Sequence, residues 1–451
     1  MVRATGASAR EHYHRFHLPG THLPHGLVTF PRRPLAWIEP WFLAYACLGV
    51  VQGGMLPMLL PLSASGSTHA GTIVGVMNLA GLTSLIWGHV ADRRRIHRRV
   101  LLLGMVAVLV ALLLMPAQLG LPLKAALAAI LGVGFAAANT VANMFIVEVW
   151  PQEEWDARIG SLQAVSGIGQ VVGLLLAGFI GGRYALAFGV AAALVAAALP
   201  IAWLTLRGVH VSIARNAAVA HPPLGGEGWV GAPQRHFHLP TWPGFAKLLR
   251  ELEMPLVRLQ IVWFAAFVAI GAVLTMFPLA LVRTFGVSHA VPATAYAFAA
   301  AGSLPIYPLA ASIAQRRGAR FVLRGGFGVR TVAIAILTGA FLSPNYDVTL
   351  ALAGFVILVL AWPLLGVSGT ALVAELARGE KGEALGLFNA FSSLAGAVGA
   401  FLGGSAMDKV GYGAVCMAAA LLMGLVTLLS GAMGARPDRP ATPGITSERP
   451  P

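Results

Sequence analysis

Charged residues are scarce in this chain. Asp, Glu, Lys and Arg make up 11% of its 451 residues, whereas an ordinary soluble domain carries about 25%. A soluble enzyme of this length needs more charged residues than this chain has to cover its surface. The chain has only two cysteines, which excludes a disulfide scaffold, and its 57% of hydrophobic residues excludes a disordered chain. A polytopic α-helical membrane protein remains.

Long apolar runs alternate with short polar breaks along the chain. One membrane span needs about 20 apolar residues, and lipid cannot satisfy the open edge of a sheet, so each run is predicted to be a helix. The predicted fold class is therefore an all-α polytopic membrane protein with 12 transmembrane helices. The predicted spans are Trp41–Leu62, Gly71–Ala91, Arg99–Leu119, Pro122–Val147, Ile159–Ile180, Tyr184–Leu206, Leu256–Val282, Ala293–Ala314, Phe321–Leu342, Val348–Glu375, Glu383–Ala406 and Gly411–Gly434.

Basic residues are distributed unevenly between the two ends of the spans. Of 31 Lys and Arg, only Lys124, Arg183, Arg283 and Lys409 fall in loops that follow odd-numbered spans. This bias predicts that both termini are cytoplasmic, and it accounts for the net charge of +14 without a nucleic-acid partner. The first 35 residues contain no apolar core of a secretory signal. We expect a multi-pass protein of the plasma membrane.

A polar gap divides the spans into six plus six. The predicted organisation is a cytoplasmic tail (1–39), a six-helix bundle (40–207), a cytoplasmic loop (208–255), a second six-helix bundle (256–434) and a cytoplasmic tail (435–451). Within the loop, Phe245, Leu248, Leu249 and Leu252 recur at helical spacing. They indicate either an amphipathic helix at the membrane surface or a simple lead into span seven.

The two halves share a residue pattern, most clearly in spans five and eleven. At a constant offset, Gly160, Ala164, Ser166, Gly173 and Gly178 correspond to Gly386, Ala390, Ser392, Gly399 and Gly404. Membrane transporters are often built from such internal repeats. The pattern predicts two pseudo-symmetric bundles.

The loop after span two carries the most specific motif. It reads Gly88-His89-Val90-Ala91-Asp92-Arg93-Arg94-Arg95, and a degenerate copy, Gln315-Arg316-Arg317-Gly318, occupies the equivalent place in the second half. With twelve spans and a long central loop, this resembles the signature of the major facilitator superfamily. The resemblance implies a two-bundle fold, transport by alternating access and one chain as the working unit.

The resemblance also implies a cytoplasmic gate. Gly88 has no side chain and lets another helix approach, and Asp92 could meet the positive end of span eleven. Arg93, Gln315 and Arg316 complete this predicted gating motif. The alternative is that the arginines only enforce topology. Arg95 departs from the family, which usually has Gly at that position.

Span five carries a second resemblance. Gly160, Gly169 and Gly173 are spaced as in the glycine-rich motif of drug–proton antiporters, although Leu174 replaces the proline of that motif. Glycines four residues apart indicate a close-packed helix face in either case. The resemblance slightly favours export.

Ionisable residues inside a membrane are costly and mark functional sites. All 17 acids lie in tails, loops or near span ends, and we expect no Lys or Arg in mid-span. These two statements predict a neutral or amphipathic substrate. Glu148 is the candidate proton carrier, with membership of the cytoplasmic gate as the alternative.

Uncharged polar residues do occur within the spans. The substrate-binding candidates are Gln52, Asn78, Asn139, Asn143, Gln163, Gln170 and Asn389. Their amides could bind a ligand or join neighbouring helices by hydrogen bonds. Trp362 and Pro363 in span ten indicate an aromatic wall or a kink, with packing against lipid as the alternative.

The predicted function is secondary active transport of a small molecule, with export slightly favoured. The alternatives are a facilitative uniporter or importer of a metabolite and, from other classes, a sensor with a transporter fold or a membrane enzyme. No nucleophile with an acid or base partner indicates an enzyme, and no cofactor or metal is expected. The expected partners are the substrate, a proton or other coupling ion and membrane lipid, with the protein as a monomer.

Overall fold

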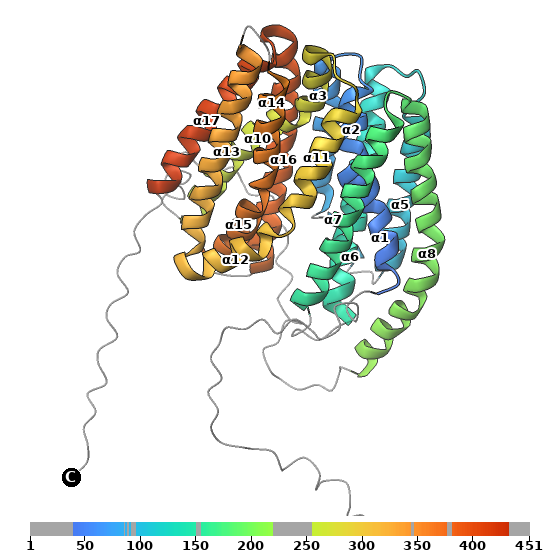
Figure 1. Cartoon of the computed structure of the whole chain (residues 1–451). Helices are drawn as coiled ribbons and strands as arrows, with labels where there is room; N and C mark the ends of the chain where they lie inside the picture. Colours follow the sequence, from blue (N-terminus) through green and yellow to red (C-terminus); the bar gives the residue numbers. More distant parts are fainter. Residues whose placement is uncertain are drawn as a thin grey trace, which may run out of the picture. The chain divides into compact units, whose positions relative to one another are not determined.

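A computed structural model describes residues 39–84, 86–87, 90–91, 96–149, 155–219, 255–343, 347–376 and 381–432. For residues 147–149, 155–157, 159–160, 207–219, 381–386 and 432 it describes the backbone only. Contacts group Ile38–Pro451 as one compact unit, and the following description concerns that unit (Figure 1).

The first half of the described chain consists of six helical segments. In chain order, they are α1 (Phe42–Gly49) with η2 (Val50–Met55) and α2 (Leu56–Leu62); α3 (Ser67–Ala80) with η3 (Gly81–Thr83); α5 (His97–Leu114); α6 (Leu121–Val149); α7 (Trp155–Ile180); and α8 (Tyr184–Val219). Each segment overlaps one predicted span. α8 continues as helix to Val219, beyond the apolar stretch Tyr184–Leu206.

The second half of the described chain also consists of six segments. They are α10 (Pro255–Phe285); α11 (Ala290–Ser303) with α12 (Ile306–Arg317); α13 (Ala319–Leu342); α14 (Val348–Leu360) with α15 (Trp362–Leu376); α16 (Lys381–Val410); and α17 (Tyr412–Ala432). Among the described residues, ten helical segments are long and apolar enough to cross a membrane, and the broken pair α11–α12 adds an eleventh. The all-α polytopic fold is confirmed, and the described residues contain twelve helical segments, six in each half, each overlapping one predicted span. The central loop prediction falls largely on residues 220–254, outside the described residues.

Span two passes from α3 into a short 3-10 helix, η3, and three other spans are interrupted near their middles. In span one, η2 is a π-helix between two α-helices, a feature that often marks functional sites. Span eight bends by 44° between α11 and α12, where Pro305 lacks the N–H needed to continue the helix. Span ten breaks at Ala361, two residues before Pro363. This break beside Pro363 agrees with the kink considered there, and the sequence pattern missed the other interruptions.

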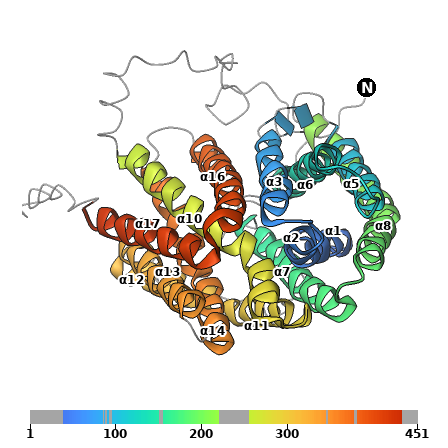
Figure 2. The same ribbon diagram turned by 90° about the horizontal axis from the view of Figure 1, so that it is seen from above.

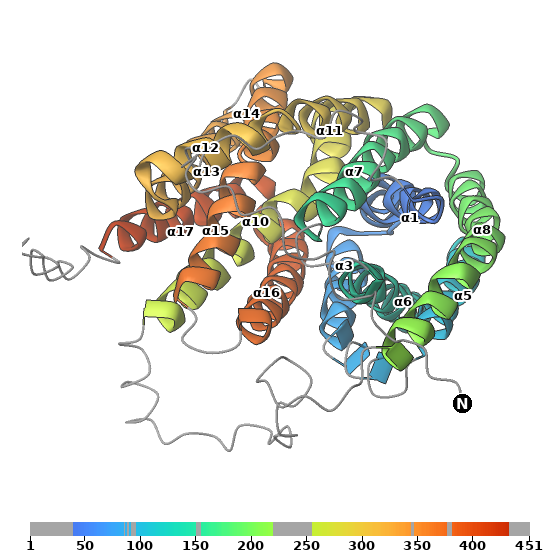
Figure 3. The ribbon, with the colours of Figure 1, turned by 90° about the horizontal axis from the view of Figure 1, so that it is seen from below.

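Each half has its own hydrophobic core. One cluster lies mainly on α1, α5, α6 and α8, and the other lies mainly on α10, α11, α13, α14 and α17, with a few residues of α2, α3 and α7. The two groups of helices are seen end-on in Figures 2 and 3, where α3 lies beside α16 and α7 lies beside α11. The halves therefore meet along these two helix pairs.

The repeated glycines have the same structural role in both halves. Gly173 of α7 packs against the Val50 carbonyl of span one, and Gly399 of α16 packs against the Val268 carbonyl of span seven. A Cβ at either glycine would overlap backbone atoms of the neighbouring helix. Spans five and eleven thus pack on spans one and seven in equivalent ways.

This close approach predicts the effect of a single methyl group. Gly173→Ala is expected to destabilise the protein by about 1–3 kcal/mol, because the added Cβ overpacks a backbone contact. Gly189→Ala in α8 is the matched control, since no atom lies within 4 Å of its Cβ, and it should be neutral or slightly stabilising. Thermal unfolding of the purified variants measures both. Equal melting temperatures for the two variants would contradict the packing described here.

Candidate functional site

Three of the predicted polar residues of the first half lie around the π-helix. Asn139 of α6 donates its side-chain N–H to the Gln52 Oε1 of η2 at 2.9 Å, and both side chains are half-buried. The side chain of Gln170, from α7, packs against Gly53 of the same π-helix. Three helices therefore bring amide groups together at this point.

The other amide candidates are more dispersed. Asn143 donates to the Asn139 backbone carbonyl at 2.9 Å, so its N–H is occupied within α6. Asn78 lies against Gly396 of α16, across the contact between the halves. Gln163 and Asn389 are exposed.

The predicted cytoplasmic gate lies largely outside the described residues. This applies to Gly88, Asp92 and Arg93, and to the side chain of Glu148. Gln315 and Arg316 are described, and both are exposed in the last turns of α12.

The opposite membrane face contains an interaction that the sequence analysis missed. We call it the odd-loop face, because it is the face of the connections that follow odd-numbered spans. Asp408, near the end of α16, accepts hydrogen bonds from the Ser67 hydroxyl and from the Thr68 N–H and hydroxyl, the latter two at 2.8 and 2.7 Å. Ser67 is the first residue of α3. The carboxylate of one half thus caps a helix N-terminus of the other half, an arrangement favoured by the helix dipole.

Further contacts join the halves at the odd-loop face. The Tyr184 hydroxyl lies 3.0 Å from the His289 Nε2, and Arg283 donates to the Ser65 carbonyl at 3.5 Å. Beneath them, Gly71 of α3 and Gly404 of α16 pack so closely that a Cβ on either would overlap the partner helix. The structure is therefore closed at the odd-loop face.

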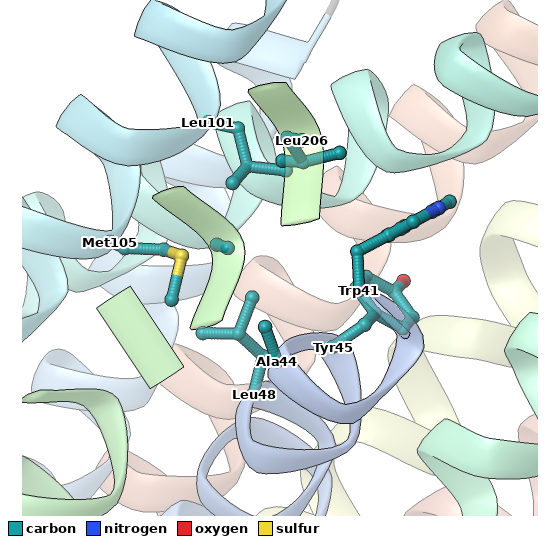
Figure 4. A pocket seen from close by; sticks show the side chains of 8 residues that line it. Trp41, Ala44, Tyr45, Leu48, Leu101, Met105 and Leu206 are labelled. Atoms are coloured by element: carbon teal, nitrogen blue, oxygen red, sulfur yellow. The ribbon is translucent and has the colours of Figure 1, made fainter. Parts of the chain in front are cut away.

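A small pocket lies inside the first half, between α1, α5 and α8 (Figure 4). The side chains that line it are Trp41, Ala44, Tyr45, Leu48, Leu101, Met105, Ala202 and Leu206. Ligand sites combine an apolar lining with several convergent polar groups. This pocket is almost wholly apolar, so we assign it to packing.

The second half contains a charged side chain in mid-membrane, and the prediction of no such Lys or Arg is wrong. Arg330 is the twelfth of the 24 residues of α13, and 1% of its surface is exposed. Arg330 lies in the middle of the predicted span Phe321–Leu342, so the sequence alone was enough to show this charge. With this cation present, the argument for a neutral substrate loses its basis.

The groups around Arg330 are aromatic. Its guanidinium carbon lies 5.4 Å from the ring centroid of Trp362, and Tyr296 and Tyr307 are close enough to interact with it electrostatically. Two of its nitrogens, Nε and one Nη, are buried without a hydrogen-bond partner. Trp362 also contacts Phe267 edge-on, at 5.7 Å between centroids. The aromatic wall considered for Trp362 is therefore present, next to the break in span ten.

Two equivalent six-helix halves that meet at one membrane face define a helical membrane protein with a transporter fold. The family model of the Major Facilitator Superfamily matches residues 41–365 and 259–451. The chain belongs to this superfamily. A search of curated proteins finds no match.

Solved transporter structures share the fold at low sequence identity. The nucleoside transporter NupG is 13% identical, with a TM-score of 0.66 over 87% of this chain and 97% of its own. A D-xylose–proton symporter is 15% identical, with a TM-score of 0.60 over 89% and 97%. An inward-facing, occupied bacterial homologue of the human lysosomal transporter Spinster is 16% identical, with a TM-score of 0.64 over 89% and 96%. These likenesses concern the fold.

Proposed function

We propose that the protein is a secondary transporter of a small organic molecule that works by alternating access. The observation that carries this proposal is the closed odd-loop face, where Asp408 of one half caps a helix of the other. These contacts are few and polar, so they can break and re-form as the halves rock against each other. Superfamily membership and the transporter neighbours support the same function.

The orientation of the transporter follows from the charge bias. With both termini in the cytoplasm of a plasma-membrane protein, the odd-loop face would be extracellular, and its closure is what an inward-facing state requires. The predicted gate at Gly88, Asp92, Arg93, Gln315 and Arg316 would then close the opposite, cytoplasmic face. Asp408 would cap the N-terminus of α3 when the odd-loop face is closed. Asp92 would cap the N-terminus of α16 when the cytoplasmic face is closed.

Direction and coupling are finer parts of the proposal. The glycine pattern of span five supports export in exchange for protons, as a drug-efflux-like protein would perform it. Glu148 is the proposed proton carrier or gate residue. A facilitative uniporter or importer is the second candidate, supported by the lack of any acid in mid-span.

Proton movement in everted membrane vesicles tests this function. After energisation, a panel of apolar, weakly polar and anionic compounds is added one at a time. Protein-dependent proton release on adding one compound establishes antiport and identifies a substrate. If no compound causes release, counterflow of labelled compounds in proteoliposomes tests uniport, and the absence of counterflow as well would favour a sensor or another non-transport role.

The gate assignment has its own expected result. Asp92→Asn should slow transport by roughly 5- to 30-fold, because loss of a charge-assisted helix cap destabilises the state that it closes by roughly 1–2 kcal/mol. The variant should remain folded and membrane-inserted, as judged by gel filtration and thermal unfolding. Wild-type transport rates in this variant would count against the gate.

A further inference from the structure

The environment of Arg330 points to a ligand. An arginine side chain keeps its charge in proteins, and buried charges are normally paired. Here Nε and one Nη are buried without a hydrogen-bond partner. The aromatic neighbours attract the cation but offer at most hydroxyl oxygens.

The chain supplies no carboxylate at this depth. All 17 acids lie in tails, loops or near span ends. The described helices that pack against α13, which are α12, α14, α15 and α17, contain a single acid, Glu375. It lies thirteen residues along α15 from Trp362, which corresponds to about 20 Å of helix. An anion that balances Arg330 must therefore come from outside the protein.

The backbone around Arg330 adds positive potential. Tyr307 is the second residue of α12, and Trp362 is the first residue of α15. Both helices begin at breaks inside their spans, so the positive ends of two half-helices lie near the guanidinium. In transporters, such interrupted helices at the bilayer midplane direct their N-termini at anionic groups of the substrate.

The depth of the site argues against a lipid headgroup. Arg330 lies about 17 Å along α13 from Ala319, and the hydrocarbon core is about 30 Å thick. It is therefore close to the midplane, far from the phosphates of either leaflet. This distance does not exclude a soluble molecule, because such a molecule would reach the site through the transport pathway.

We propose that Arg330, with Tyr307 and Trp362, forms a subsite in the second half that binds the oxyanion of a small transported molecule, a carboxylate or a phosphate. The inference rests on the proposed transport function and specifies its substrate class. Trp362 covers the guanidinium and has 38% of its surface exposed, so its ring is the lid of the subsite. The adjacent Phe267 and Trp263, stacked at 4.4 Å, would contact an apolar or aromatic body of the substrate.

The test uses the full chain in phosphatidylcholine nanodiscs, in a buffer free of carboxylate and phosphate. Benzoate, phenyl phosphate and inorganic phosphate are compared with benzamide and benzylammonium, which share the ring of benzoate but carry no oxyanion. Binding is measured by tryptophan fluorescence and by the rise in melting temperature. Trp362→Phe identifies the part of the fluorescence signal that belongs to the lid.

At least one oxyanion should bind the wild type at least tenfold more tightly than benzamide, and benzylammonium should not bind. Arg330→Met should lose this binding at least tenfold, and Arg330→Lys should lose part of it. The matched control is Arg324→Met, an exposed arginine of the same helix, which should bind as the wild type does. Because Arg330→Met removes an unpaired buried charge, its melting temperature without ligand should be equal to or above that of the wild type.

Four outcomes would overturn the proposal: equal binding of benzoate and benzamide, unchanged binding in Arg330→Met, no response of the wild type to any oxyanion, or an Arg330→Met protein that does not fold. If the protein in phosphatidylglycerol nanodiscs gave the same response without any added oxyanion, the site would be assigned to lipid instead. Counterflow of a neutral compound without oxyanion binding would contradict this subsite and leave the transporter intact. Oxyanion binding without any transport would contradict the transporter and leave the subsite intact.

Discussion

Asp408→Asn is expected to shift the protein away from the state that is closed at the odd-loop face. The carboxylate accepts hydrogen bonds from the Thr68 N–H and hydroxyl, and hydrogen bonds to a charged group are stronger than those to a neutral amide. Losing the charge should cost this state about 1–2 kcal/mol, or roughly 5- to 30-fold in the ratio of closed to open molecules. The expected result is a larger population with the odd-loop ends of the halves apart.

Spin labels at Leu186 and Thr294 measure this population. The two positions are exposed and lie near the odd-loop face, one in each half. The labels are attached to cysteines introduced at these positions in a protein that lacks Cys47 and Cys416. The distribution of distances between the two labels is then recorded with and without Asp408→Asn.

Asp347→Asn is a matched control for the gate. Asp347 also caps a helix, accepting from the Thr349 N–H at 2.8 Å and the Leu350 N–H at 3.1 Å, but this cap lies within the second half. It should lower stability without changing the distance distribution. An unchanged distribution in Asp408→Asn, or an equal change in Asp347→Asn, would argue that the Asp408 cap does not control the gate.

The Gln52–Asn139 pair gives the second large expected effect. Replacing either residue alone by Leu leaves the other amide without its partner, at an expected cost of about 1–3 kcal/mol, whereas replacing both should be nearly neutral. Thermal unfolding of the two single variants and the double variant measures this cycle. Transport distinguishes the two interpretations of the pair: if it binds substrate, the double variant recovers stability and still fails to transport.

The hydrogen bond between Thr331 and Thr427 provides the control for this cycle. Their hydroxyls lie 3.0 Å apart and join α13 to α17. Val substitutions at both positions should leave transport unchanged. Recovery of transport together with stability in the Gln52→Leu/Asn139→Leu protein would show that the pair only joins helices.

The sequence predicted where each span lies but less about how it is built. Span boundaries follow from apolar length, and the predicted Val348–Glu375 differs by one residue from the described Val348–Leu376. The same pattern cannot show a π-helix at Val50–Met55, because π and α segments have the same hydrophobic composition. Nor does it show that the span eight helix breaks at Pro305 rather than curving, since Pro200 lies inside the continuous helix α8.

The candidate site was predicted unevenly for similar reasons. Amides within spans are visible in the sequence, but only the packing of α6 against η2 pairs Asn139 with Gln52. The sequence shows Arg330 as a charge in mid-span. It does not show that Arg330 lacks a hydrogen-bond partner, because this depends on every helix packed around it. Asp408 was visible as an acid near a span end, but its role depends on a contact with a residue more than 300 positions away.

The sequence by itself determined the fold class, the twelve spans, their division into halves and the resemblance to the superfamily. These properties depend on local quantities: apolar length against membrane thickness, and backbone hydrogen bonds closed within each helix. Only the tertiary structure decided which face of the molecule is closed, which amides meet and that Arg330 is buried without a partner. Those properties depend on which helix faces pack together, and packing is fixed by contacts between distant parts of the chain.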